Sequence, residues 1–330
     1  MKSTELTNEM ATNDRVAKRG IARSAAITAL LLLALGGCAT GHSEQQQAQG
    51  TAQSTTADWK AVEQAMGRAG ALLPGDVYRF SMPRSDLKVT AQGVEIKPAF
   101  ALGSWAAFKM AGNQAMVMGD IVMTEDEVNS VISRLQQGGI EQTALHHHLL
   151  YETPRVIYLH IGGHGDAVKL AETISATLKL TKTPPPAPPV ASQSQDLGID
   201  TKQIEQTIGH SGKVNGGVFQ VSVPRAERIT EAGMEVPPSM GMATAINFQP
   251  TGAGRAAITG DFTMTASEVN PVIRALRDNG IEVTSLHNHM LNDEPRLFFI
   301  HFWANDDAVK LARGLKVALD KTNSAKGPAM

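Results

Sequence analysis

Two stretches decide the fold, because one repeats the other: "GDIVMTEDEVNSVISRLQQGGIEQTALHHHLLYETPR" (Gly119–Arg155) and "GDFTMTASEVNPVIRALRDNGIEVTSLHNHMLNDEPR" (Gly260–Arg296). From Gly119 to Leu180, roughly 45% of positions are identical in the second copy, which establishes an internal repeat. Shorter matches extend the repeat: "VEQAMGRAG" (Val62–Gly70) with "IEQTIGHSG" (Ile204–Gly212), "SMPR" (Ser81–Arg84) with "SVPR" (Ser222–Arg225), and "DAVKLA" in both copies (Asp166–Ala171, Asp307–Ala312). The chain is therefore predicted to contain one domain twice.

A proline-rich segment separates the two copies. "TKTPPPAPPVASQSQDLGID" (Thr181–Asp200) begins with a dense proline run, typical of a stiff polyproline spacer, and continues as a softer polar stretch. Each copy is roughly 120 residues long, enough to bury a core of its own. The predicted organisation is a leader at 1–37, a flexible tether at 38–57, a first repeat at 58–180, the linker at 181–200 and a second repeat at 201–325.

The leader has the pattern of a lipoprotein signal peptide. An apolar run, Ala25–Leu35, is too short to read as a full membrane span. It ends in "LALGGC", which resembles a bacterial lipobox with Cys38 as the lipidated residue. The alternative is a short membrane anchor with an incidental cysteine. A basic region precedes the run: Arg15, Lys18, Arg19 and Arg23.

Composition excludes two classes of protein. Cys38 is the only cysteine, so no intrachain disulfide can form. Removal of residues 1–37 takes the formal net charge from −2 to about −4, and no basic stripe is present, so nucleic acid is not an expected partner. The stretch from His42 to Asp58 is polar and lacks apolar periodicity, as expected for a tether that holds the folded part off a membrane.

The second copy reads as strands, a helix, two strands and a helix. Strands are expected around Val218–Val223, Met242–Phe248 and Ala256–Met264, and a helix near Lys202–Gly209. Thr265 and Glu268 form a predicted capping box for the next helix, which Gly280 ends. The runs "IEVTSLHNHML" and "RLFFIHFW" predict two further strands, and "NDDAVKLARGLKVALDK" a closing helix. This order predicts a tandem α+β fold, each repeat an antiparallel-rich sheet covered by helices, with a ferredoxin-like core as one candidate.

Matched histidines mark the candidate site. They are His146, His148 and His160 in the first copy and His287, His289 and His301 in the second. Residues i and i+2 of a strand share a face about 7 Å apart. If Asn292–Arg296 form a five-residue connection, Leu291 pairs with Leu297 and His287 lies opposite His301. A four-residue connection would turn His301 to the other face.

Two interpretations of these histidines stay open. Three neutral imidazoles on one face could bind zinc or another transition metal and leave a position for water or substrate. Alternatively, buried histidines are satisfied by backbone or carboxylate partners without metal. Candidate acid/base or outer-sphere groups are the acidic turn residues Glu152, Asp293 and Glu294. The aspartates of the matched "GD" pairs, Asp120 and Asp261, are expected to end neighbouring strands and could orient an imidazole through its second nitrogen.

The duplicated histidine block, "DEPRLFFIHFW" and the lipobox together resemble the LppY/LpqO-type bacterial lipoproteins, a family with a domain of unknown function. The resemblance implies a protein of the bacterial cell envelope, lipid-anchored on the periplasmic or outer-membrane side, and it implies no known activity.

Two functions from different classes follow. The first is a lipid-anchored binding or accessory protein that recognises a small molecule, a metal or an envelope component, with its two repeats packed on each other. The second is a metal-dependent enzyme, a hydrolase or lyase, that uses the His-x-His pair and the third histidine.

Overall fold

The computed structural model describes residues 59–186 and 196–327. The leader, Cys38, the tether and part of the proline-rich linker lie outside the described residues. Within these two ranges, no helix is both long and apolar enough to cross a membrane. The repeats belong to one compact unit.

Each repeat is built around a six-stranded antiparallel sheet. The first repeat comprises α1 (Trp59–Met66), β1 (Ala71–Leu73), β2 (Val77–Pro83), β3 (Val89–Ala91), β4 (Val94–Ile96), α2 (Pro98–Ala101), β5 (Gly103–Ala111), β6 (Gln114–Thr124), α3 (Val128–Gln137), β7 (Glu141–His146), β8 (Glu152–Thr153), β9 (Val156–Gly165) and α4 (Ala167–Leu178). The second comprises α5 (Thr201–Ile208), β10 (Gly212–Asn215), β11 (Val218–Val223), β12 (Thr230–Glu231), β13 (Met234–Glu235), the 3₁₀ turn η1 (Pro238–Met240), β14 (Thr244–Gly252), β15 (Arg255–Thr265), α6 (Ala266–Asp278), β16 (Glu282–His287), β17 (Asp293–Glu294), β18 (Leu297–Asp307) and α7 (Ala308–Leu319).

The strand order confirms the predicted α+β class. The sheets run β1-β2-β5-β6-β9-β7 and β10-β11-β14-β15-β18-β16. In the first, α3 links β6 to β7, and β9 lies between these two strands and pairs with both. This is the split βαβ arrangement of a ferredoxin-like core, and β5 occupies the fourth strand position. The second sheet repeats the order element for element.

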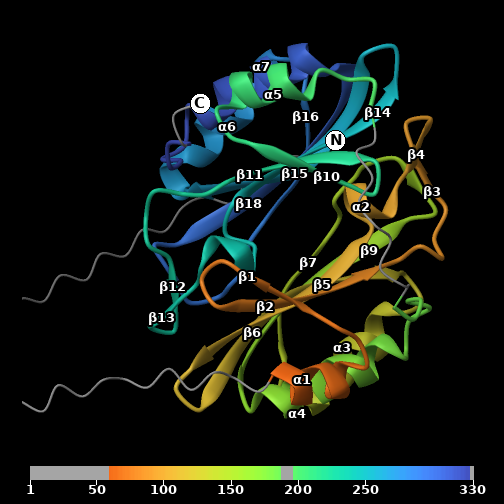
Figure 1. Cartoon of the computed structure of the whole chain (residues 1–330), viewed down its shortest axis with the longest axis vertical. Helices are drawn as coiled ribbons and strands as arrows, with labels where there is room; N and C mark the ends of the chain where they lie inside the picture. Colours follow the sequence, from red (N-terminus) through yellow and green to blue (C-terminus); the bar gives the residue numbers. More distant parts are fainter. Residues whose placement is uncertain (1–58, 187–195, 328–330) are drawn as a thin grey trace, which may run out of the picture. The chain divides into compact units, whose positions relative to one another are not determined.

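Helices cover one face of each sheet. Figure 1 shows α1, α3 and α4 on one face of the first sheet, and α5, α6 and α7 on one face of the second. Phe80, Phe108 and Ile161 of the first sheet pack with Val131 of α3 and Ile174 of α4 in one apolar core. Burial of these side chains, at about 25 cal/mol per Å², is the main stabilising contribution within a repeat.

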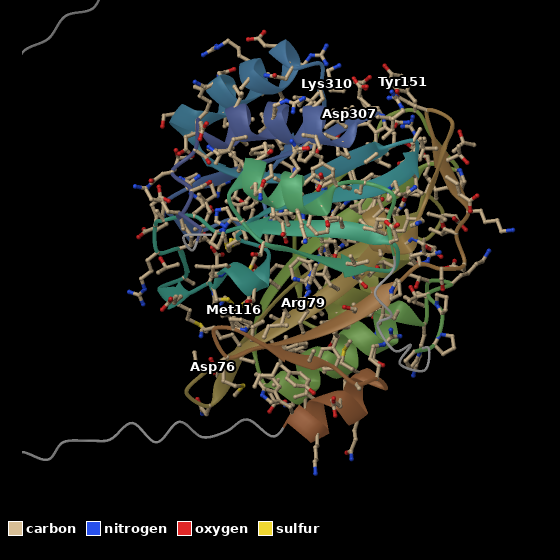
Figure 2. All side chains as sticks on the ribbon, turned by 45° about the horizontal axis from the view of Figure 1, so that its top comes forward. Asp76, Arg79, Met116, Tyr151, Asp307 and Lys310 are labelled. Atoms are coloured by element: carbon tan, nitrogen blue, oxygen red, sulfur yellow. The ribbon has the colours of Figure 1, made fainter. Side chains whose placement is uncertain are left out.

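Local signals position the helices as the sequence predicts. The Thr265–Glu268 capping box is present at the start of α6. Asp307 caps α7, because its carboxylate accepts a 2.7 Å hydrogen bond from the backbone N–H of Lys310 (Figure 2). The matched segments "SMPR" and "SVPR" each end in a buried arginine just after β2 and β11: Arg84 bonds to Glu127, and Arg225 to Glu268, both at 2.7 Å.

The helix-free faces of the two sheets pack on each other. One apolar cluster joins Tyr158 of the first repeat to Val218 and Trp303 of the second. A second cluster joins Met116 to Phe299. This packing explains why β6 is buried from Ala115 to Met123 without alternation: helices cover one face of the strand, and the other repeat covers the other.

The register of the histidine-bearing strands differs from the expected one. His287 pairs with Phe299, and Ser285 pairs with His301, after a β-bulge between Val283 and Ser285. The pairing is displaced by two residues, so the direct His287–His301 pair was wrong, but both histidines keep the same face. The same displacement occurs in the first repeat, where Ala144 pairs with His160.

The structure also corrects two further expectations. The strand predicted over residues 281–291 ends at His287, so His289 lies in the turn that follows β16. Asp120 and Asp261 lie inside β6 and β15 rather than at strand ends, and each is the direct cross-strand partner of a histidine, His160 and His301.

Candidate metal centre

The six matched histidines form one cluster between the repeats. Rings from different repeats lie in contact: the centroids of His146 and His287 are 4.0 Å apart, those of His148 and His301 3.8 Å, and those of His160 and His289 3.9 Å. The sequence grouped the histidines by repeat. The structure brings both groups to a single centre, because the histidines occupy the helix-free faces that pack together.

An internal pseudo-twofold axis relates the two halves of the cluster. The centroid distance of His148 to Tyr158 is 3.4 Å, and the equivalent distance of His289 to Phe299 is also 3.4 Å. Two further matched centroid distances also agree. His146 to His301 and His287 to His160 are both 5.3 Å. Within each repeat, His146 to His160 is 4.8 Å and His287 to His301 is 4.7 Å. The axis passes near the stacked His146 and His287, as in an isologous dimer interface.

Backbone carbonyls fix the tautomer of three of the rings. His301 Nδ1 donates to the carbonyl of Gly260 at 2.6 Å, and His160 Nδ1 donates to Gly119 at 3.3 Å. His289 Nδ1 donates to Gly241 at 3.2 Å. Because a carbonyl oxygen can only accept, each Nδ1 carries the proton and each Nε2 keeps its lone pair. An imidazole held this way presents Nε2 to a metal, as in most protein metal sites.

The two "GD" aspartates face the same space. Asp261 Oδ2 lies 2.8 Å from His289 Nε2, and Asp120 Oδ2 lies 3.3 Å from His148 Nε2. In neutral His289 the proton is on Nδ1, so Nε2 carries only a lone pair and cannot donate a hydrogen bond to a carboxylate. A proton or a cation between the two groups resolves the contact. Burial raises the pKa of Asp261 to about 7.

Burial keeps the imidazoles neutral. It lowers the pKa of His289 to about 3 and of His301 to about 4. Burial, followed by the neighbouring histidines, also lowers the pKa of His146 and of His287. Neutral imidazole is the form that binds metal, so the cluster is ready for a cation at neutral pH.

Many polar atoms of the cluster lack a hydrogen-bond partner. Within the described residues, the unpartnered buried atoms include seven from this centre: Nδ1 of His146, Nε2 of His148, His160, His287 and His289, and Oδ1 of Asp120 and Asp261. An unmade hydrogen bond at a buried polar group costs about 1–3 kcal/mol, so such a concentration calls for an explanation. Every one of these atoms is a metal-ligand type.

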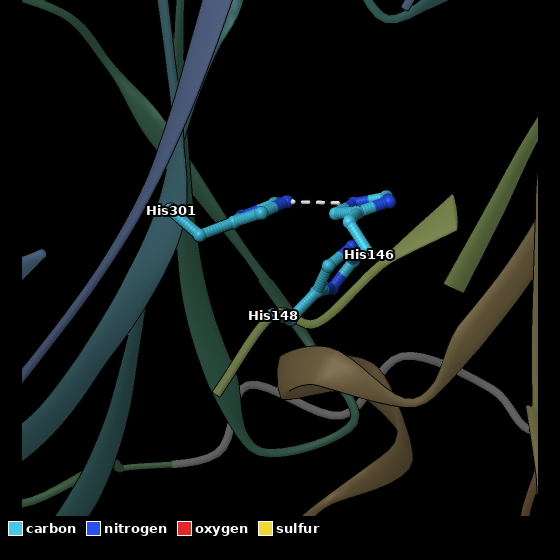
Figure 3. A group of neighbouring side chains, drawn as sticks. All are labelled: His146, His148 and His301. Carbon is cyan, nitrogen blue, oxygen red and sulfur yellow. Dashed lines mark hydrogen bonds between the residues drawn. The ribbon is translucent and has the colours of Figure 1, made fainter. Parts of the chain in front are cut away.

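Three overlapping groups have donor atoms within 4.8 Å of one another: His146, His148 and His301; His146, His160 and His287; and Asp261, His287 and His289. Figure 3 shows the first, in which a 3.3 Å hydrogen bond joins the Nε2 atoms of His146 and His301. Two nitrogens bound to one tetrahedral zinc at 2.0–2.1 Å lie about 3.3 Å apart. The donor types and this spacing fit a transition-metal ion.

The acidic turn residues Asp293, Glu152 and Glu294 stabilise local structure rather than supply donors to the histidine cluster. Asp293 accepts from the backbone N–H of Leu297 at 2.6 Å and from Arg296 at 3.0 Å, which fixes the turn before β18. Its counterpart Glu152 accepts from Val156 in the same way, and burial raises the pKa of Glu152 to about 7. Glu294 pairs with Thr230 in a small outer sheet.

Several residues around the cluster were not among the site residues predicted from the sequence. Tyr158 and Phe299 stack on His148 and His289, and alternation from His160 and His301 could have placed them on the same face. Arg79, labelled in Figure 2, lies over Trp105 at 4.1 Å and donates to the carbonyl of Ser239 in the other repeat. Burial lowers the pKa of Arg79 to about 10, and the charge of Asp120 partly opposes this shift.

Comparisons with known proteins identify the repeated unit. A family model described as Domain of Unknown Function (DUF1259) matches residues 60–180 and again 202–321. Among curated proteins, none matches the chain. Two solved structures show a distant likeness: EtuB from Clostridium kluyveri, at 9% identity and TM-score 0.19, over 79% of this chain and 97% of that one; and a trimeric bacterial microcompartment shell protein, PduB, at 14% and 0.17, over 74% and 88%. With TM-scores this low, neither likeness bears on fold or function.

Proposed function

The chain belongs to this family of unknown function, and from that premise we propose that it binds a transition-metal ion at the centre between its two repeats. The observation that carries the proposal is the convergence of six neutral imidazoles and two carboxylates with seven unpartnered donor atoms. Zinc suits imidazole and carboxylate ligands in four-coordinate sites, and copper, nickel and iron also accept imidazole.

Elemental analysis tests this proposal. The protein is purified without a histidine tag and its metal content is compared with that of His287→Ala/His289→Ala/His301→Ala. The matched control is His147→Ala/His164→Ala/His210→Ala, which removes the same number of histidines from outside the cluster. We expect near-stoichiometric metal in the parent and the control, and a large loss in the cluster variant. Metal-free parent protein that also fails to bind added Zn²⁺ would refute the proposal.

A metal-dependent hydrolase or lyase is the second candidate. The observation that favours it is a pocket of about 300 Å³ lined by residues including Leu145, His146 and His147. One histidine of the cluster, His146, therefore lines a cavity. A bound ion there could polarise a carbonyl or activate water. Metal-dependent turnover of a model ester that is lost in His146→Ala and kept in His164→Ala would support this candidate. No turnover by the parent protein of any substrate in a broad panel would count against it.

Lipid anchoring at Cys38 in the bacterial cell envelope is part of the same proposal. The lipobox-like "LALGGC" and the polar tether support it. A metal centre on a tethered domain would then serve at the periplasmic or outer-membrane side of a membrane, together with a small-molecule or envelope partner. Labelled palmitate should enter the full chain expressed in bacteria and be absent from Cys38→Ala. Equal labelling of both proteins would exclude the anchor.

A further inference from the structure

Ring orientation divides the cluster into two sets of donors. An imidazole binds an ion close to its ring plane, along the nitrogen lone pair. His146 and His287 are stacked, with centroids 4.0 Å apart and planes 15° from parallel. Two rings stacked in this way cannot direct lone pairs at the same ion. The group that contains both of them, with His160, is therefore not a single site.

The two remaining groups share no residue. His146, His148 and His301 form one, and Asp261, His287 and His289 form the other. In the first, the His148 ring is tilted by 45° and 37° against its two neighbours, so the lone pairs can converge. In the second half, the tilts of His289 against His287 and His160 are 43° and 41°. By the matched angles, the His160 ring is tilted against His289 as the His301 ring is tilted against His148.

The matched aspartate completes each set to four donors. Asp261 contacts His289, and Asp120 contacts His148, in equivalent positions. Each set then has three histidines and one carboxylate, the number and types of ligand for a tetrahedral ion. Each set also takes its third histidine from the opposite repeat.

We propose that the chain binds two transition-metal ions, one to Asp120, His146, His148 and His301, and one to Asp261, His287, His289 and His160. This inference rests on the proposed metal-binding function. It explains why both copies keep all their histidines: each repeat supplies three of the four donors to one ion and the fourth donor to the other ion. The stacked pair His146 and His287 lies between the two ions, which are on opposite sides of the pseudo-twofold axis.

Metal stoichiometry tests the inference on the full chain. The metal-free protein is dialysed against excess Zn²⁺, and bound zinc is measured in the parent, His148→Ala, His289→Ala, the double variant and the surface control His164→Ala. We expect two equivalents in the parent and control, one in each single variant and none in the double variant. One equivalent in the parent overturns the two-ion inference but leaves metal binding intact, whereas none in the parent overturns both. Loss of both ions in a single variant also overturns the inference.

A second measurement guards against variants that fail to fold. The parent is loaded with Cu²⁺ and examined by electron paramagnetic resonance at increasing metal ratio. Two neighbouring ions should give a dipole-broadened spectrum with a half-field transition as the second equivalent binds. A single isolated copper signal at saturation would overturn the two-ion inference without reference to any variant.

Discussion

At the scale of single residues, the cluster depends on atoms that the backbone holds in place. The carbonyls of Gly119 and Gly260 fix His160 and His301, and the next residue in each strand is the aspartate that faces the cluster. A "GD" pair in a strand thus has two roles at the proposed metal site. The glycine carbonyl orients a histidine ligand, and the aspartate is itself a ligand. Outer hydrogen bonds of this type usually determine ligand orientation.

The first residue-scale prediction concerns pH. The folded-state pKa of His301 is about 4 and that of His289 about 3, against an ordinary 6.5. Below pH 6.5 the unfolded chain binds protons that the folded chain does not, so lower pH removes stability, by up to about 1.4 kcal/mol per pH unit for each histidine. For His301 the loss runs from about pH 6.5 to 4, and for His289 from 6.5 to 3.

Asp261 acts in the opposite direction. Its folded pKa of about 7 lies above the ordinary 3.8, so it contributes stability at low pH that is lost as the pH rises toward 7. Glu152, whose pKa is also raised to about 7, acts in the same direction. Two carboxyls thus oppose six histidines, so the metal-free protein should lose free energy of unfolding between pH 7 and 5. Urea unfolding across this range measures the loss, and His289→Gln should show a shallower slope. A flat profile would mean that the histidines are not buried in the neutral form.

The second residue-scale prediction concerns Gly260. A Cβ there would lie 1.9 Å from the carbonyl oxygen of Ala245 on the neighbouring strand, a clash with backbone that cannot move alone. Gly260→Ala should cost about 2–4 kcal/mol of unfolding free energy and displace the carbonyl that holds His301. Gly162→Ala is the control, because its Cβ would meet Thr143 at an ordinary 3.7 Å. Similar losses in both variants, measured by urea unfolding, would argue against the close strand approach.

At the scale of elements, two β-bulges join the repeats. The bulges in β7 and β16 leave Thr143 and Thr284 outside the ladders with β9 and β18. Thr143 Oγ1 donates to the carbonyl of His289 at 2.7 Å, and Thr284 Oγ1 donates to the carbonyl of His148 at 2.6 Å. Bulges commonly re-aim a side chain next to a functional site. Here the threonine at each bulge binds the turn that carries the second histidine of the other repeat's His-x-His pair.

The element-scale prediction follows from these bonds. Thr143→Val and Thr284→Val keep the side-chain shape, remove one bond each and leave a carbonyl without its donor, which should cost about 1–2 kcal/mol per site. Thr230→Val, which loses a weaker 3.4 Å bond to Glu294 within one repeat, is the control. Urea unfolding of the three variants and the parent gives the comparison. The interface account fails if the bulge variants match the control.

The same elements show where sequence reasoning succeeds and where it stops. Capping, alternation and internal repetition predict α6, β11 and the antiparallel-rich sheets, because each is a local signal. The pairing of His287 with Phe299 lies two residues from the expected register because the connection from β16 to β18 is longer than the five residues expected, and each bulge changes the pairing by one further residue. Parity nevertheless survives, since a shift of two returns each side chain to the same face. The histidines of the site could therefore be identified from the sequence, whereas their direct cross-strand partners could not.

At the scale of the whole molecule, the site arises from duplication. The sequence reveals two matched sets of three histidines, but the meeting of the sets depends on two long-range apolar clusters that join the helix-free sheet faces. No spacing within one copy encodes that contact. The tilted His148 and His289, with their aspartates, become ligand sets only when His301 and His160 arrive from the opposite repeat.

The most direct measurement of the central claim is a crystal structure of the zinc-loaded protein, with an anomalous difference map recorded above the zinc absorption edge. The account predicts strong density between the repeats, within bonding distance of Nε2 of His148 and His301 on one side of the stacked His146 and His287, and of His160 and His289 on the other. Zinc bound only at the surface, with the cluster closed by direct hydrogen bonds and empty of anomalous density, would contradict it.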